Sequence, residues 1–395
     1  MFTFVIYKLL LMDFIPLFSR IKEPTLFGRY ITNEHIAPIL ATLSSKFDVK
    51  TIGHSVNGKP IYSVTIGTGK QKILMWSQMH GNESTTTKAL FDLFNFLAED
   101  SVEAKKIKSE FTLLCIPILN PDGAEAYTRV NANGIDLNRD SVNLSQPESQ
   151  LLRATFDQFS PNYCFNLHDQ RTIFAAGNTR NPATVSFLSP TYNAEREINE
   201  VRKSAMQVIV AMNEELQKCI PNQIGRFDDS FNINCIGDLF QSLGTPTILF
   251  EAGHFQGDYE REETRKYIFI ALLSGIIFIS ENDVVVNIIA NYLNIPQNTV
   301  GFRDFIYKKV KINTNPLNII TTFAAQYKEV LQDEKIIFEA YFTEIGNEIP
   351  FFGHQEYDGE EECYHDNSNN IPEIEKKADF YLGKNKEFVN GLIKM

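Results

Sequence analysis

The chain has 395 residues, of which 43% are apolar and 22% are charged, and its formal net charge is -12. Because one hydrophobic core rarely grows beyond about 250 to 300 residues, we expect two domains. The negative charge balance, with no basic stripe, argues against a nucleic acid partner. No apolar run reaches the length of about 20 residues that a membrane span needs, so we expect no membrane partner either. Nothing in the sequence predicts the oligomeric state.

The first twelve residues form an apolar run with Lys8 in its middle. The run has no basic start and no small-x-small cleavage site, so a start at Met12 or a disordered tail is at least as plausible as a secretory signal. We predict residues 1–24 to be an N-terminal extension. The five cysteines are scattered and include no Cys-x-x-Cys pair, which favours a reducing compartment and a cytoplasmic location.

Residues 25–294 show the alternation of strand and helix patterns that is typical of parallel strands covered by helices. Asn57-Gly58 separates two alternating runs and predicts a β-hairpin between residues 47–56 and 60–67. The further strands are predicted at residues 72–77, 111–118, 163–167 and 247–250, and the helices at 33–44, 84–99, 146–159, 193–218 and 259–280. The expected fold class is α/β, with a mixed, mostly parallel central sheet flanked by helices.

The chain changes character at Ile295-Pro296, because the residue before a proline is pushed out of helical geometry. Beyond it, residues 305–312, 319–323 and 335–342 are rich in Ile, Phe, Thr and Tyr. They predict a small β-rich C-terminal domain over residues 295–395, for which the sequence indicates no chemistry. The acidic residues between Glu356 and Asp366 lack the spacing of a calcium loop, so we interpret them as a solvated acidic loop.

The stretch that suggests chemistry is His80-x-x-Glu83, in the turn between a predicted strand and a predicted helix. An imidazole and a carboxylate three positions apart can reach one cation, and catalytic zinc takes three protein ligands. His168, at the end of another predicted strand, supplies the third. Glu251 also follows a strand. In open α/β sheets the ligand lies beyond the carboxyl ends of the strands, so we expect these four side chains to converge there.

Five further motifs follow in order along the chain. They are Asn120-Pro-Asp-Gly123, Arg129-Val-Asn131, Gly134-Ile-Asp-Leu-Asn-Arg139, Asn166-Leu-His168 and Leu249-Phe-Glu-Ala-Gly253. In this order and at these separations the set resembles the M14 family of zinc metallocarboxypeptidases, over roughly residues 59–281. The resemblance implies one Zn²⁺ per chain and hydrolysis of the C-terminal peptide bond, with a peptide or small amide that carries a free carboxylate as substrate.

The chemistry assigns roles to these residues. Zinc held by His80, Glu83 and His168 would polarise a water and a carbonyl, and Glu251 would act as general base. The other roles are implied by the resemblance alone. Asp136 would hold His80 from the second ring nitrogen, Arg129 would stabilise the developing oxyanion, and the substrate-binding residues Asn138 and Arg139 would hold the terminal carboxylate.

The chain departs from the family pattern in two ways. No tyrosine occurs between Pro221 and Glu251, where the family usually has one that caps the substrate. The specificity position falls near Ile236 or Gly237, and neither is acidic, which argues against a strict preference for C-terminal Lys or Arg. The departures keep an N-acyl amino acid deacylase open as an alternative. An inactive peptide-binding homologue is disfavoured, because the base and all three ligands are present.

Overall fold

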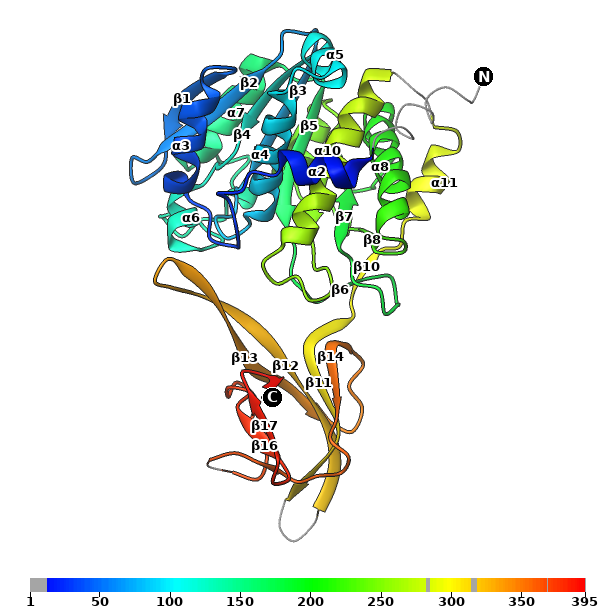
Figure 1. The fold of residues 1–395 in the computed structure, drawn as a ribbon. Coiled ribbons are helices and arrows are strands. Elements are labelled where there is room, and N and C mark those ends of the chain that lie inside the picture. The colour runs from blue at the N-terminus through cyan, green and yellow to red at the C-terminus, as the bar shows by residue number, and fades with distance from the viewer. Residues whose placement is uncertain (1–12, 282–284, 314–317, 368, 395) are drawn as a thin grey trace. The chain divides into compact units, whose positions relative to one another are not determined.

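The computed structural model describes residues 13–281, 285–313, 318–367 and 369–394 (Figure 1). The chain falls into two compact units. The N-terminal unit runs to Gln170 and continues over Ala183–Asn298, whereas the C-terminal unit consists of Arg171–Pro182 and the chain from Thr299 onward. The division expected at residues 294 and 295 had placed Arg171–Pro182 in the catalytic domain. The predicted leader or tail over residues 1–12 lies outside the described residues.

The N-terminal unit is built on an eight-stranded sheet with the order β1-β2-β4-β3-β5-β9-β7-β8. The strands are β1 (Asp48–His54), β2 (Pro60–Ile66), β3 (Gln71–Ser77), β4 (Phe111–Ile116), β5 (Tyr163–Asp169), β7 (Val185–Leu188), β8 (Ile224–Arg226) and β9 (Thr247–Ala252). Strands β4, β3, β5 and β9 run parallel, while β1 with β2, β2 with β4, and β7 with β9 are antiparallel. The mixed sheet and the hairpin at Asn57-Gly58 are therefore confirmed.

Helices cover both faces of this sheet, because the residues of its central strands alternate between two apolar clusters. On β3, Ile73 and Met75 belong to the larger cluster, and Leu74 and Trp76 to the smaller one. The helices that contribute to the larger cluster include α2 (Phe14–Ile21), α3 (Asn33–Leu43), α4 (Thr85–Leu97), α5 (Val102–Glu110), α8 (Glu200–Cys219) and α10 (Glu262–Glu281). Those on the other face include α7 (Pro147–Phe159) and α9 (Ile236–Ser242). The chain also forms α6 (Pro121–Ala126) and α11 (Ile288–Leu293).

One predicted helix starts too early. The pattern over residues 193–218 suggested a helix from Asn193, but α8 begins only at Glu200. The physical reason is a cap: Asn199 has extended backbone geometry and its side chain accepts a hydrogen bond from the N–H of Arg202 at 2.8 Å. Asparagine is among the most favoured N-cap residues, so the helix starts after it.

The C-terminal unit is rich in β-strands, as predicted. One four-stranded sheet has the order β13-β12-β11-β14 and a smaller one the order β15-β16-β17-β18. The strands are β11 (Phe302–Asn313), β12 (Asn318–Gln332), β13 (Lys335–Gly346), β14 (Phe352–Asp358), β15 (Tyr364–His365), β16 (Phe380–Leu382), β17 (Lys386–Val389) and β18 (Leu392–Ile393). A short pair joins β6 (Phe174–Ala176) to β10 (Asn298–Val300). Aromatic residues, among them Tyr307, Phe323 and Phe380, fill the core of the C-terminal unit.

Several carboxylates of the acidic loop in this unit pair with neighbouring lysines. Lys308 pairs with Glu356 at 2.6 Å, and Lys386 with Glu360 at 2.5 Å. Among the described residues of this loop, no three His, Cys, Asp or Glu side chains lie close enough together to hold one cation. Across all the residues that the structure describes, no helix has the length and apolar character that crossing a bilayer requires.

Candidate metal centre

Three predicted ligands meet at the edge of the N-terminal sheet where parallel strands β3, β5 and β9 end. His80 Nδ1 lies 2.8 Å from Glu83 Oε1, and His168 Nδ1 lies 2.8 Å from Glu83 Oε2. The two Nδ1 atoms are 3.1 Å apart. Tetrahedral zinc at about 2.0 to 2.1 Å from nitrogen implies ligand separations of about 3.3 Å, so this donor set fits one such ion. All three side chains are largely buried.

The turn that carries His80 is held by a second turn of the motif set. Asn120 Nδ2 donates to the carbonyl of Met79 at 3.2 Å, and its N–H donates to the carbonyl of Gln78 at 3.0 Å. The backbones approach so closely that a Cβ on Gly81 would lie 1.9 Å from the carbonyl carbon of Gly123. Only glycine permits such an approach. Asn120–Gly123 thus fixes the loop from which His80 and Glu83 project.

The charges of the three ligands depend on one another. Burial by itself would raise the pKa of Glu83, but the neighbouring His80 and His168 lower it well below its usual range, which keeps the carboxylate ionised. Burial lowers the pKa of His168. For His80 burial acts in the same direction, yet the Glu83 charge and the hydrogen bond to Asp136 raise its pKa overall. The centre is thus negatively charged at Glu83, as a cation site requires.

Two residues missed by sequence reasoning stabilise this arrangement. The N–H of Asp169 donates to Glu83 Oε2 at 3.2 Å, and the carboxylate of Asp169 accepts from the N–H of Thr85, at the start of α4, at 3.0 Å. Asp169 therefore links the end of β5 to the loop that carries Glu83. Arg261 Nη2 donates to the carbonyl of Gln170 at 2.8 Å. Strand alternation put Asp169 on the opposite face from His168, so its sequence position gave no signal of this contact.

Asp136 and Arg129, both predicted from the motif set, lie beside His80. Asp136 Oδ1 is 3.1 Å from His80 Nε2, which leaves Nδ1 free to face Glu83 and His168. Arg129 Nε donates to Asp136 Oδ2 at 3.0 Å, and its Nη1 lies 3.3 Å from Glu83 Oε1. Burial would raise the pKa of Asp136, but the hydrogen bond and charge of His80 lower it. The Arg129 side chain is 47% exposed, so solvent still reaches this cation.

Asn138 and Arg139 lie in a short 3-10 turn, Leu137–Arg139, capped by Asp136. Asn138 Oδ1 accepts a hydrogen bond from the N–H of Ile236 at 3.0 Å, and thereby joins this turn to the start of α9. Arg139 Nη1 donates to Cys235 Sγ at 3.1 Å. Cys235 is 96 residues away in sequence, and nothing in its local pattern predicted the contact. No carboxylate pairs with Arg139 among the described ion pairs, so its guanidinium is available for an anion.

Glu251 faces the metal cluster from β9, where it is the register partner of His168 on β5. It is 8% exposed, and its Oε2 has no hydrogen-bond partner in the described part of the chain. Burial raises the pKa of Glu251 well above its usual range, and the negative charges of Glu83 and Asp169 add to that shift. His168 Nε2 is likewise buried without a partner among these residues. Both atoms are therefore available to hydrogen-bond a bound water or substrate.

The predicted specificity positions, Ile236 and Gly237, open helix α9 and are buried. Nearby acidic residues are already engaged. Asp238 accepts from the N–H of Thr191 at 3.0 Å and of Asn232 at 3.1 Å, and burial raises its pKa to about 6. Because its oxygens are occupied, Asp238 is not a free anion for a basic substrate side chain.

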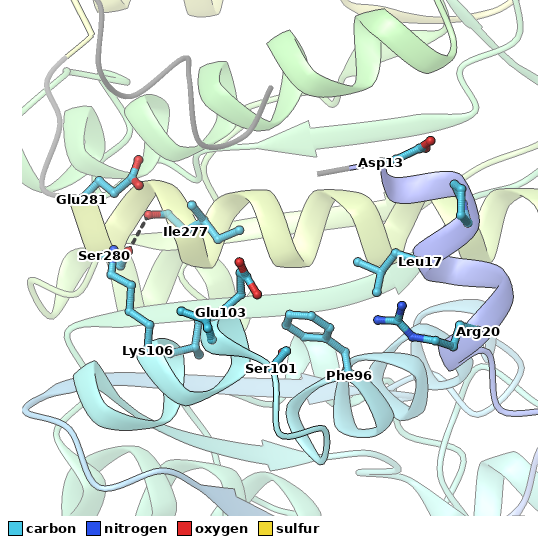
Figure 2. Close-up of a pocket in the computed structure, with 13 residues that line it drawn as sticks. Asp13, Leu17, Arg20, Phe96, Ser101, Glu103, Lys106, Ile277, Ser280 and Glu281 are labelled. Atoms are coloured by element: carbon cyan, nitrogen blue, oxygen red, sulfur yellow. Dashed lines mark hydrogen bonds between the residues drawn. The ribbon is translucent and has the colours of Figure 1, made fainter. Parts of the chain in front are cut away.

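A separate pocket of about 370 Å³ lies between α2, α5 and the end of α10 (Figure 2). Leu17, Phe96 and Ile277 contribute to its apolar wall, and Arg20 and Lys106 to its charged rim. It contains none of the ligands, so it is not the site of the predicted chemistry.

Comparison with known families gives an independent match. Residues 33–213 match the family model described as zinc carboxypeptidase. Among curated proteins, the "Probable carboxypeptidase 2" of Arthroderma benhamiae is 32% identical over 113 residues, which cover 28% of this chain and 21% of that protein. Carboxypeptidase SOL1 of Arabidopsis thaliana is 28% identical over 158 residues, which cover 33% of this chain and 32% of that protein. The chain spans about a fifth of the length of the curated relatives it first matches.

Solved structures show the same fold. A metallo-carboxypeptidase from Burkholderia cenocepacia superposes with a TM-score of 0.52 at 17% identity, over 64% of this chain and 70% of that one. Carboxypeptidase A from Helicoverpa armigera gives a TM-score of 0.50 at 15% identity, over 70% and 81% of the two chains. At these identities the likeness concerns the fold.

Proposed function

We propose that this chain, whose residues 33–213 match the zinc carboxypeptidase family model, hydrolyses the C-terminal peptide bond of peptides with a free terminal carboxylate. The observation that carries the proposal is the convergence of His80, Glu83 and His168 within hydrogen-bonding distance, with the unpaired carboxylate oxygen of Glu251 on the neighbouring strand. The match covers less than half of the chain, so the reaction rests on this geometry as well as on the family.

His80 Nδ1, Glu83 and His168 Nδ1 are the atoms that would hold the zinc ion. When bound, zinc supplies a Lewis acid that polarises a water and the scissile carbonyl. The chain's part is to keep Glu83 ionised and to orient the imidazole of His80, which Asp136 does through Nε2. An outer partner of this kind typically changes metal affinity by about 10 to 100-fold.

Glu251 acts as the general base in this proposal. It takes a proton from the attacking water and delivers it to the departing nitrogen, so that one carboxylate serves both proton transfers. Its raised pKa supports the second task, because a carboxylic acid that holds its proton more tightly is present for longer as a donor. In the same proposal Arg129, whose Nη1 lies 3.3 Å from Glu83 Oε1, stabilises the negative charge that develops on the carbonyl oxygen.

Asn138 and Arg139 hold the terminal carboxylate. A guanidinium binds a carboxylate through two parallel hydrogen bonds, and Arg139 has no carboxylate of its own among the described ion pairs. A substrate with an amidated end would leave this cation without a counter-charge. Preference for free C-termini, and hence exopeptidase action, follows from that pairing.

A second candidate is hydrolysis of N-acyl amino acids on the same centre. The observation in its favour is that no tyrosine stands between Pro221 and Glu251 to cover a bound peptide, whereas Phe227 and Phe231 in that stretch cannot donate a hydrogen bond from their rings. The two reactions need the same metal, base and carboxylate clamp. They differ only in what lies on the far side of the broken bond.

The deciding experiment offers the purified, zinc-loaded protein a matched panel: tetrapeptides with free C-termini, the same peptides amidated, and N-acetyl amino acids. We expect release of the C-terminal residue from the free peptides only, at one zinc per chain. Hydrolysis confined to the acetylated amino acids would establish the second candidate instead. Zinc binding without hydrolysis of any compound would show a binding protein and contradict the proposal.

A further inference from the structure

Asn166 lies on the same face of the sheet as the candidate metal centre. It stands two residues before His168 on β5, and residues i and i+2 of a strand share a face about 6.6 Å apart. Asn166 is 2% exposed, and its Oδ1 has no hydrogen-bond partner among the described residues. A buried carbonyl oxygen without a partner is unfavourable, because it has lost its hydrogen bonds to water. The side chain thus offers a buried acceptor to a group that enters the site.

Gly237 keeps the amide of Asn166 within reach. A Cβ on Gly237 would lie 3.8 Å from Asn166 Nδ2 and 3.1 Å from Pro190 Cγ. A side chain at position 237 would therefore occupy the space next to the amide. The backbone of Gly237 does not have a positive φ, so conformational freedom is not the reason for this glycine. Its missing side chain matters for the room it leaves.

The same place is where the last side chain of a substrate would go. Asn138, one half of the proposed carboxylate clamp, accepts a hydrogen bond from the N–H of Ile236, the residue before Gly237. The side chain of a C-terminal residue starts one carbon away from its carboxylate. With the carboxylate at Asn138 and Arg139 and the scissile carbonyl at the ligands, that side chain would lie beside the start of α9, where Gly237 borders the amide of Asn166.

The surroundings match a neutral amide. Leu249 is the register partner of Asn166 on β9 and is largely buried, as is Ile236, so the walls are apolar. On the other side, Trp76 is the register partner of Asn166 on β3, and its indole N–H is also buried without a partner among the described residues. A side-chain amide carries one donor group and one acceptor, which complement the Asn166 carbonyl and the Trp76 N–H.

We propose that Asn166 is a specificity-determining residue that selects substrates ending in glutamine or asparagine. The proposal rests on the function proposed above and adds the substrate class to it. A site built to hydrogen-bond a substrate group rejects the analogue that lacks the group, because its own polar atoms then stay unpaired. Glutamine should therefore be preferred over methionine, and asparagine over leucine, which are of similar size and shape.

The test compares peptides that end in glutamine or methionine. We expect kcat/KM of the unaltered protein to favour glutamine by about 10 to 100-fold, which corresponds to one or two hydrogen bonds to a buried polar group. In Asn166→Leu the preference should fall to near parity, through loss of glutamine cleavage and with methionine cleavage retained. Asn162→Ala, an exposed asparagine just before the same strand, is the matched control and should keep the preference. Equal cleavage of both peptides by the unaltered protein would overturn the assignment.

A second measurement does not depend on turnover. Free glutamine and free methionine are the products, and calorimetry on the zinc-loaded protein gives their dissociation constants. Glutamine should bind about 10-fold more tightly, and Gly237→Ala, which adds a methyl group beside the amide, should weaken its binding. If both products bind equally, a buried water satisfies Asn166 and the proposal is wrong, whether or not the protein cleaves peptides. If glutamine binds selectively but no peptide is cleaved, the proposed function fails and the specificity assignment stands.

Discussion

Two buried clusters of charged residues in the described part of the N-terminal unit differ in whether all of their polar atoms have hydrogen-bond partners. The metal cluster consists of His80, Glu83 and His168. The Arg265 cluster, between α4 and the start of α10, consists of Lys88, Asp92, Glu262 and Arg265. Arg265 and Asp92 are completely buried and form two hydrogen bonds of 2.6 Å, and Lys88 donates to Glu262 at 2.5 Å.

In the Arg265 cluster every buried side-chain nitrogen and oxygen has a hydrogen-bond partner among the described residues. At the metal cluster, His168 Nε2 and the neighbouring Glu251 Oε2 have none. Shifted pKa values occur at both places: burial lowers the pKa of Lys88 in the Arg265 cluster to about 8, and burial raises the pKa of Glu251, beside the metal cluster, well above its usual range. A perturbed pKa alone therefore does not identify a functional site. Unsatisfied polar atoms in a converging geometry distinguish the two, because a cluster that serves only stability has every reason to be complete.

The most severe test of this contrast removes a ligand from the metal cluster. In His168→Ala we expect zinc to fall from one per chain to background, because the loss exceeds the about 10 to 100-fold that an outer partner costs. Turnover should disappear with the metal. Zinc content by atomic emission and turnover of a free peptide are the measurements. Asp92→Asn in the Arg265 cluster is the counterpart and should retain its zinc.

Removal of the proposed base tests the mechanism while the three metal ligands stay in place. Glu251→Gln keeps the size of the side chain and removes its ability to take a proton, so kcat should fall by about 10² to 10⁴-fold. Zinc content should stay at one per chain, because Glu251 is not a ligand. Hydrolysis at the parent rate by this variant would refute the assigned mechanism.

The Arg265 cluster should respond in stability and not in catalysis. Arg265→Met leaves the Asp92 carboxylate buried without its cation, which costs about 3 to 5 kcal/mol in the free energy of unfolding. Urea denaturation measures it. The double variant Asp92→Leu with Arg265→Met removes both charges and should be less destabilised than the single one. A fall in kcat per folded, zinc-loaded molecule would show that the two clusters are coupled.

The smallest effect concerns pH. Burial would raise the pKa of Glu262, but the charges of Lys88 and other neighbours lower it to about 2 in the folded protein. A carboxylate whose folded pKa is depressed adds stability above its unfolded pKa of about 4.3, and this contribution is lost as pH falls toward 2. The stability difference between the unaltered protein and Glu262→Gln should therefore shrink by about 2 to 3 kcal/mol between pH 5 and 2. A constant difference across that range would contradict the pairing.

Much of the N-terminal unit could be predicted because local signals and packing agree there. The Asn57-Gly58 hairpin, helix α3 and strands β3, β5 and β9 follow from residue periodicity, and the ends of those strands located His168 and Glu251. Strands β7 and β8 were missed, because segments of four and three residues carry no measurable period and exist only through their neighbours.

Long-range contacts outside the motif set could not be predicted. Nothing in the composition of Arg171–Pro182 indicates that it leaves one unit and joins the other. The same holds for the contact of Arg139 with Cys235, and for Asn166, whose importance lies in a partner it lacks. Sequence motifs identify residues that act in known ways, but an unsatisfied atom can be recognised only when its surroundings are known.

The close approach of Gly81 and Gly123 also limits how this centre can be moved or redesigned. Because their backbones touch without intervening side chains, neither loop can move without the other, although 41 residues separate the two glycines along the chain. A transplant of the His80–Glu83 loop into another α/β scaffold would have to bring Asn120–Gly123 with it. Any lineage that enlarged Gly81 would have had to reshape the loop at Gly123 at the same time.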